Sequence, residues 1–150
     1  MKARLLVING PNLNLLGTRE PDIYGSGTYS ELLTMLRDAA AERRFSLDFF
    51  QSNHEGVIID ALHDSVGVYD GIVINPGAYT HYSYAIYDAL LAIGIPAVEV
   101  HISNITTREP FRRTSVTAPA CIAQIHGEGF FGYIRAMDTL LDALYDSSND

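Results

Sequence analysis

The sequence has one cysteine, Cys121, among 150 residues. A lone thiol cannot form an internal disulfide, and there is no group of cysteines to bind a structural zinc ion. No apolar run approaches the roughly 18 residues of a membrane-spanning helix. The apolar stretch near the N-terminus is too short for a signal-peptide core. These absences argue against a secreted disulfide scaffold and a helical membrane protein, and we expect a cytoplasmic protein.

Basic residues are the minority among the charged side chains. The chain has 10 Lys+Arg and 18 Asp+Glu, which gives a formal net charge of −8. Nucleic-acid-binding domains usually have a basic surface, and acidic membranes repel an acidic protein. We therefore expect neither nucleic acid nor a membrane as a partner. An acidic substrate would have to be held by a local cluster of basic side chains.

The apolar pattern predicts strands that alternate with helices. Strands are expected at residues 5–8, 45–49, 71–75, 97–101 and 121–125, and helices at 28–39, 52–65, 80–93 and 130–144. Thr28 with Glu31, and Ser52 with Glu55, have the spacing of a capping box. Such alternation indicates right-handed βαβ units. We predict an α/β fold, a flavodoxin-like doubly wound three-layer sandwich with a five-stranded parallel sheet.

The length of the chain predicts a single domain over residues 1–150. Residues 10–27 contain four glycines and two prolines, and within them residues 17–27 are expected to form a lid loop. Residues 146–150 are predicted to be a disordered tail.

Polar side chains follow the predicted strands. Ligands of open parallel sheets bind beyond the carboxyl ends of the strands. Three of the five histidines lie at or just past such ends, as do several amides; these segments are residues 9–14, 52–55, 75–81 and 101–104. Asn12, Asn75 and Ser103 could bind hydroxyl groups or a catalytic water.

His101 follows a buried strand, where a histidine can simply be a satisfied core residue. With Ser103 and His81 nearby, a general acid or base becomes a stronger interpretation, because the pKa of a free histidine is about 6.5. Glu99 points to the same strand face and could orient the imidazole. A metal site is the competing interpretation, but the sequence contains no HExxH, His-x-His or His-x-x-x-His.

Tyr24 lies in a glycine-bounded loop, five residues after Arg19. A free tyrosine has a pKa of about 10, so it can act as a base only beside a positive charge, and Arg19 is the nearest in sequence. A mobile surface loop explains the pattern equally well. Arg108, Arg112 and Arg113 form a second basic group, which is either a solvated loop or a binding site for a carboxylate or phosphate.

The absence of a P-loop and of GxGxxG leaves a nucleotide cofactor without support. Cys121 is expected to be inert within its strand.

Six segments, in order and between residues 8 and 133, together resemble one family closely. They are INGPNLNLLGTREPDIYG, SNHEG, NPGAYTH, EVHISNI, REPFRRTS and GFFGY. The family is type II 3-dehydroquinase of the shikimate pathway. The resemblance implies a flavodoxin-like subunit that eliminates water from 3-dehydroquinate in the anti sense through an enolate, with neither metal nor Schiff base, and hence no cofactor.

By this resemblance Tyr24 is the base, and Arg19 lowers the pKa of its hydroxyl group. His101 protonates the departing hydroxyl. Asn12 would hold the water that stabilises the enolate. The substrate-binding positions implied are Asn75, His81, Asp88, Ile102, Ser103 and Arg112. Asp88 on its predicted helix looks like a solvated residue, but in the family it reaches a neighbouring subunit's site. The resemblance therefore implies a homo-oligomer, commonly a dodecamer built from trimers.

Some positions depart from the family pattern. Thr106 stands where histidine is usual, Arg113 and Thr114 replace a pair that is often His-His, and Tyr87 replaces a frequent arginine. These departures concern subunit contacts, affinity and loop geometry more than the reaction. Two alternatives stay open: a non-enzymatic flavodoxin-like binding or signalling module, and a family member that is inactive or acts on another hydroxy-ketone acid.

Overall fold

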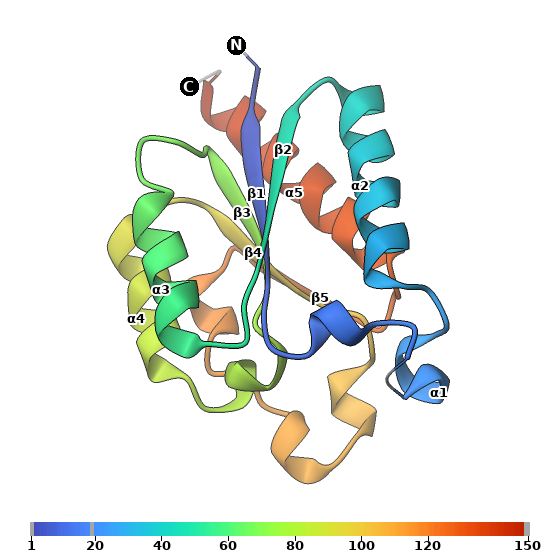
Figure 1. Ribbon diagram of the computed structural model, residues 1–150. Helices are drawn as coiled ribbons and strands as arrows, with labels where there is room; N and C mark the ends of the chain where they lie inside the picture. Colours follow the sequence, from blue (N-terminus) through green and yellow to red (C-terminus); the bar gives the residue numbers. More distant parts are fainter. Residues whose placement is uncertain (1, 19, 149–150) are drawn as a thin grey trace.

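The computed structural model describes residues 2–18 and 20–148, and it contains a five-stranded parallel sheet in the order β2-β1-β3-β4-β5. Helices cover both faces of the sheet (Figure 1). The predicted doubly wound α/β sandwich is confirmed. The strands are β1 (Arg4–Asn9), β2 (Ser46–Gln51), β3 (Gly71–Asn75), β4 (Ala97–His101) and β5 (Ala123–His126), and the helices are α1 (Pro21–Tyr24), α2 (Tyr29–Arg43), α3 (Glu55–Asp64), α4 (Tyr84–Ile93) and α5 (Phe131–Ser148).

Alternation along the central strands builds two apolar layers. In β1, Leu5 and Val7 pack toward α2 and α5, whereas Leu6 and Ile8 pack toward α3 and α4. All four side chains are at most 5 % exposed. A strand buried on both faces is a continuous apolar run, and this explains why periodicity alone located the centre of the sheet.

Two helix starts test the capping predictions. The Thr28 hydroxyl accepts a 3.1 Å hydrogen bond from the Glu31 amide, so the first predicted cap is confirmed. The second is wrong, because α3 begins at Glu55 and its cap residue, His54, makes no side-chain cap bond. Strand β2 continues to Gln51, and the Glu55 carboxylate accepts a 2.5 Å hydrogen bond from the Ser83 hydroxyl at the start of α4 instead.

Several element boundaries differ from the sequence predictions. The helix expected from residue 80 starts at Tyr84, where Ser83 caps it, and a 3₁₀ turn, η2 (Gly77–His81), precedes it. Gly94 ends α4 with a φ of 66°, as expected for a glycine stop. Within the predicted lid, residues 21–24 form the short helix α1. Residues 146–148 are helical and not a disordered tail, since α5 runs to Ser148; residues 149–150 lie outside the described residues.

The last strand is also shorter than predicted at its start. A 3₁₀ turn, η5 (Ala118–Ala120), takes up the preceding residues, and the Cys121 amide closes it on the Ala118 carbonyl. Cys121 therefore precedes β5, with a half-buried side chain rather than a core strand position. Burial raises the pKa of its thiol to about 12, which agrees with the expected inertness.

Between β4 and η5 the chain makes two further 3₁₀ turns, η3 (Ile105–Thr107) and η4 (Pro110–Arg112). They place the three arginines of this connection beyond the carboxyl end of the sheet. Over residues 2–18 and 20–148, no helix combines the length and apolarity needed to cross a bilayer.

Candidate active site

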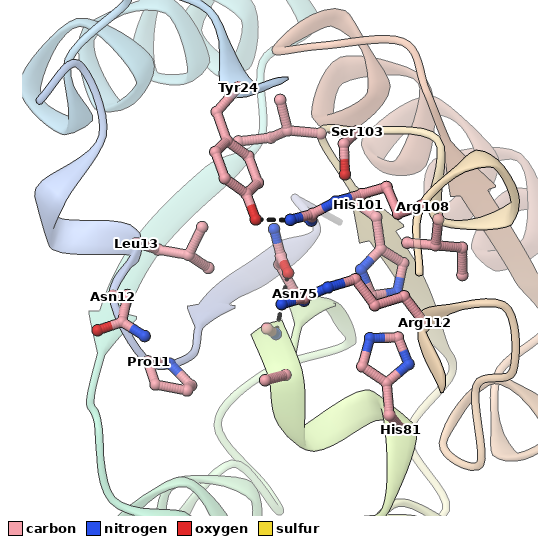
Figure 2. Close-up of a pocket in the computed structure, with 14 residues that line it drawn as sticks. Pro11, Asn12, Leu13, Tyr24, Asn75, His81, His101, Ser103, Arg108 and Arg112 are labelled. Carbon is pink, nitrogen blue, oxygen red and sulfur yellow. Dashed lines mark hydrogen bonds between the residues drawn. The ribbon is translucent and has the colours of Figure 1, made fainter. Parts of the chain in front are cut away.

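A cavity of about 200 Å³ lies at the carboxyl ends of β1, β3 and β4 (Figure 2). The lid, the strand ends and the η3–η4 connection all contribute to its wall. Its lining residues are Pro11, Asn12, Leu13, Tyr24, Asn75, Gly77, Ala78, His81, His101, Ile102, Ser103, Ile105, Arg108 and Arg112.

Eight of the ten predicted site residues therefore line one cavity. The exceptions are Asp88, which is exposed on α4, and Arg19, which lies outside the described residues. No group of three or more His, Cys, Asp or Glu side chains suited to hold a metal ion occurs in the part of the chain that the structure describes.

His101 and Glu99 form a buried pair at the end of β4. Imidazole Nε2 lies 3.0 Å from Glu99 Oε2, and the two residues are 6 % and 0 % exposed. Residues two positions apart in a strand point to the same face of the sheet, so this contact agrees with the expectation from the sequence. Since a carboxylate only accepts hydrogen bonds, Nε2 carries the proton and Glu99 fixes the orientation of the ring.

Glu99 is held by four donors in an otherwise dry environment. Besides His101, it accepts hydrogen bonds from Thr117, from Ser115 at 2.7 Å and from the Gln124 amide at 2.9 Å. Burial by itself raises the pKa of a carboxyl group, but here the hydrogen bonds and the charge of His101 outweigh it and lower the pKa of Glu99 below 4.5.

Tyr24 has a cationic partner from a distant part of the chain. Arg108 Nη1 donates a 2.7 Å hydrogen bond to the Tyr24 hydroxyl, and the guanidinium carbon lies 5.2 Å from the ring centre. Glu20 Oε2 lies 3.6 Å from Nη2 of the same arginine. Figure 2 shows this pair across the cavity from Asn12.

Sequence reasoning missed Arg108 as the partner of Tyr24. The only signal was the group of three arginines, and spacing could not distinguish its members. The structure does: Arg108 and Arg112 line the cavity, whereas Arg113 is exposed and does not.

Arg112 and His81 belong to another part of the cavity wall. Arg112 Nε donates a 2.6 Å hydrogen bond to Glu109, and its guanidinium carbon lies 4.7 Å from the centre of the Phe111 ring. His81 Nδ1 lies 2.8 Å from the Thr114 carbonyl oxygen and therefore donates to it. Burial lowers the pKa of His81, as do the nearby His101 and Arg112, against the opposing effect of this hydrogen bond. His81 thus offers an acceptor at Nε2.

The asparagines of the site differ in exposure. Asn75 is 3 % exposed; its Oδ1 accepts a 3.1 Å hydrogen bond from the Gly77 amide, and its Nδ2 donates a 2.9 Å hydrogen bond to Tyr133. Asn12 is exposed at the rim, with a φ of 70° that asparagine tolerates better than most residues.

The two residues that follow His101 complete the wall. The carbonyls of Ile102 and Ser103 accept hydrogen bonds from Gly129 and Gly127, which fix this turn against the start of α5.

The chain matches the model of one protein family, "Dehydroquinase class II", over residues 3–141. It is similar to 3-dehydroquinate dehydratase of Caldicellulosiruptor saccharolyticus, with 58 % identity over 94 % of this chain and 98 % of that protein. The enzyme of the same name from Clostridium acetobutylicum is 57 % identical, over 94 % and 98 %. The crystal structure of type II dehydroquinase from Butyrivibrio crossotus superposes with a TM-score of 0.92 and 52 % identity, over 93 % of this chain and 97 % of that one. With this sequence match over nearly its whole length and this agreement in fold, the chain belongs to the class II dehydroquinase family.

Proposed function

We propose that the chain is a hydro-lyase of the shikimate pathway that converts 3-dehydroquinate to 3-dehydroshikimate by anti elimination of water. The observation that carries this proposal is the pairing of a tyrosine with an arginine and of a histidine with a carboxylate around one cavity. Tyr24 contacts Arg108, and His101 contacts Glu99. Proton removal and proton delivery thus have separate candidate groups.

Tyr24 is the proposed base. As a phenolate it removes the proton next to the ketone, and the electron pair of the broken C–H bond forms an enolate. The guanidinium of Arg108 supports this role, because a positive charge at hydrogen-bond distance stabilises the charged form of a phenol. Arg19, outside the described residues, keeps its proposed role as a second cation on the lid.

His101 is the proposed acid. The enolate collapses and expels the hydroxyl group, which takes a proton from the imidazolium and leaves as water. The buried Glu99 carboxylate supports this role, since it accepts the hydrogen bond from Nε2 and fixes the orientation of the imidazole ring. Asn12, at the rim, is proposed to hold the water that stabilises the enolate oxygen.

Arg112 is the proposed anchor of the substrate carboxylate. It is a cation of the cavity wall on a protein with net charge −8, so attraction must act at short range. Asn75, His81, Ile102 and Ser103 are proposed to bind the hydroxyl groups and the carboxylate through amide, ring and backbone groups. The proposed reaction uses these side chains alone and needs no cofactor.

The proposed functional unit is an oligomer, with dodecamers built from trimers as the specific expectation. Asp88 is exposed on α4, outside the cavity of its own chain, and the same helix exposes Tyr84 and Leu91. An apolar surface beside an exposed carboxylate supports a subunit contact that delivers Asp88 to a neighbouring site.

The cytoplasm is the proposed compartment.

Steady-state kinetics on 3-dehydroquinate test the proposal, with formation of the conjugated product followed by its ultraviolet absorbance. His101→Ala and Tyr24→Phe are each expected to lower kcat at least about 100-fold, the lower end of general acid–base contributions. Matched controls are His63→Ala, near the end of α3, and Tyr69→Phe, whose hydroxyl contacts Asp48. No turnover by the wild-type chain, or turnover of another hydroxy-ketone acid instead, would overturn the proposed substrate.

A further inference from the structure

One tyrosine hydroxyl joins two buried asparagines beneath the cavity. Asn9 and Asn75 are register partners at the ends of β1 and β3, and Tyr133 enters from α5. The Tyr133 hydroxyl donates a 2.7 Å hydrogen bond to Asn9 Oδ1 and accepts one of 2.9 Å from Asn75 Nδ2. Tyr133 and Asn9 are 0 % exposed and Asn75 is 3 % exposed, so bulk water cannot replace these bonds.

The number of available protons fixes the direction of each bond. A tyrosine hydroxyl has one proton, and here Asn9 Oδ1 accepts it. The phenolic oxygen can then only accept, and it must face the NH₂ end of Asn75. Oδ1 of Asn75 is in turn directed at the Gly77 amide, 3.1 Å away.

A flipped Asn75 amide would be mismatched at both ends. Its oxygen would face the lone pairs of Tyr133, and its NH₂ group would face the Gly77 N–H. Buried polar groups left unsatisfied in this way are costly. The observed orientation leaves Asn75 one N–H and one oxygen lone pair for a ligand in the cavity that it lines.

We infer that Tyr133 is a positioning residue for substrate binding, which acts by fixing the amide orientation of Asn75. The inference rests on the proposed placement of Asn75 in the substrate site. It also gives a role to the segment GFFGY, which the proposed reaction does not otherwise use. Phenylalanine at residue 133 would fill the same space but could not join the two asparagines.

The neighbouring Gly132 lets α5 begin close to the sheet. A Cβ atom there would lie 3.3 Å from Val100 Cγ2 and 3.4 Å from Ile125 Cγ2, tighter than ordinary packing. The small residue therefore keeps the start of α5 near enough for Tyr133 to reach both strand ends.

Steady-state kinetics of Tyr133→Phe on 3-dehydroquinate test the inference. The KM is expected to rise about 2- to 12-fold, the range for one net hydrogen bond, with kcat within about twofold of wild type. Tyr69→Phe is the matched control, since it removes a tyrosine hydroxyl that bonds to Asp48 far from the cavity. An unchanged KM in Tyr133→Phe would overturn the inference.

A double-mutant cycle separates positioning from a general loss of structure. In an Asn75→Ala background, Tyr133→Phe should add no further change in KM, because there is no amide left to orient. A further change of the full size would mean that Tyr133 acts elsewhere, and would overturn the inference. If Asn75→Ala itself left KM and kcat unchanged, the placement of Asn75 in the substrate site would fail instead.

Asn9→Ala tests the same chain of bonds from its other end, should Tyr133→Phe fail to fold. It frees the Tyr133 proton, so the hydroxyl can donate to a flipped Asn75, and only the mismatch with the Gly77 amide still opposes the flip. The KM is expected to rise here too, and the rise should again disappear in the Asn75→Ala background. A wild-type KM for Asn9→Ala would contradict the inference.

Discussion

Arg108 Nη1 lies 2.7 Å from the Tyr24 hydroxyl, although 84 positions separate the two residues in the chain. The contact joins the lid to the connection after β4. It would supply the positive charge that the proposed catalytic role of Tyr24 requires, from a residue that the sequence indicated only as one of three arginines.

Removing that charge should slow the reaction. Arg108→Ala is expected to lower kcat about 10- to 160-fold, which corresponds to a charge-assisted hydrogen bond of about 1.5–3 kcal/mol. Arg108→Lys should recover part of the loss, since it keeps the charge but not the planar fork. Arg113→Ala is the matched control, because Arg113 is exposed outside the cavity. Equal losses in the two alanine variants would point to net charge rather than to the contact with Tyr24.

The site was predictable where it depends on strand ends. Asn75 and His101 end buried strands, and the carboxyl ends of parallel strands converge at one edge of a sheet, so their proximity followed from the pattern. The orienting carboxylate Glu99 followed from strand alternation in the same way.

Contacts between distant loops were not predictable. The pairing of Arg108 with Tyr24 depends on how 3₁₀ turns fold back over the sheet, and no periodicity describes that path. The failed cap at Ser52 has a similar cause, because the Glu55 carboxylate accepts its hydrogen bond from Ser83, the residue that caps α4. The role of Tyr133 was not predictable, because a tyrosine among the apolar residues of a predicted helix is indistinguishable in sequence from a residue that only packs in the core.

Gly25 should matter for catalysis through its backbone. It follows Tyr24 directly, with a φ of 82° and a ψ of 175°, a conformation nearly exclusive to glycine. No atom lies within 4 Å of a Cβ built there, so strain alone opposes alanine. Gly25→Ala is expected to destabilise the fold or displace the end of α1, at a cost of about 1–3 kcal/mol, and to lower kcat.

Gly67→Ala is the control for this prediction. Gly67 has a φ of 78° and equally open space, but it lies after α3, away from the cavity. Thermal unfolding and kcat should be measured for both variants. Both should lower Tm, and only Gly25→Ala should lower kcat; a normal kcat in Gly25→Ala would show that the reaction does not depend on this turn.

Glu99 should make the stability of the fold depend on acid pH. Its folded-state pKa is lowered below 4.5, so its stabilising contribution is fully present above that value and is lost as the pH falls through the folded pKa. Glu99→Gln removes this dependence and places an NH₂ group among donors. The difference in Tm between wild type and Glu99→Gln should therefore be largest near neutral pH and should shrink below about pH 4.5.

Thermal unfolding between pH 3 and 7 checks this. Glu42→Gln is the control, since the Glu42 side chain is 82 % exposed, and its Tm should follow that of wild type throughout. A Tm difference for Glu99→Gln that stays constant over the whole pH range would mean that Glu99 is not an ionised buried group.

Asp88 offers a test of the proposed assembly by complementation. If it completes a neighbouring site, Asp88→Ala and Tyr24→Phe should each be nearly inactive alone. Co-expressed, they should form mixed oligomers in which an intact Tyr24 meets an intact Asp88 from the other variant, and activity should return. Light scattering should give a mass well above 16.5 kDa. A fully active monomer, or no recovery in demonstrably mixed oligomers, would contradict the shared site.

Arg112 provides the test of substrate charge. The protein has a net charge of −8 and the proposed substrate is a carboxylate, so long-range attraction is unfavourable and binding must come from short-range contacts. Arg112→Ala removes a charge-assisted contact of about 1.5–3 kcal/mol, which is roughly a 10- to 160-fold loss in kcat/KM. The carboxylate lies away from the bonds that break, so the loss should appear mainly in KM.

Arg112→Lys should recover only part of this loss, because lysine cannot present a bidentate fork. Arg112 also donates to Glu109, so Glu109→Gln, which weakens that contact but keeps the arginine, is the matched control. We expect a KM change in Glu109→Gln much smaller than in Arg112→Ala. If Arg112→Ala left kcat/KM within twofold of wild type, Arg112 would not be the carboxylate anchor. Arg108, the other arginine in the described part of the cavity wall, would then take that role, and its alanine variant would raise KM instead of lowering kcat.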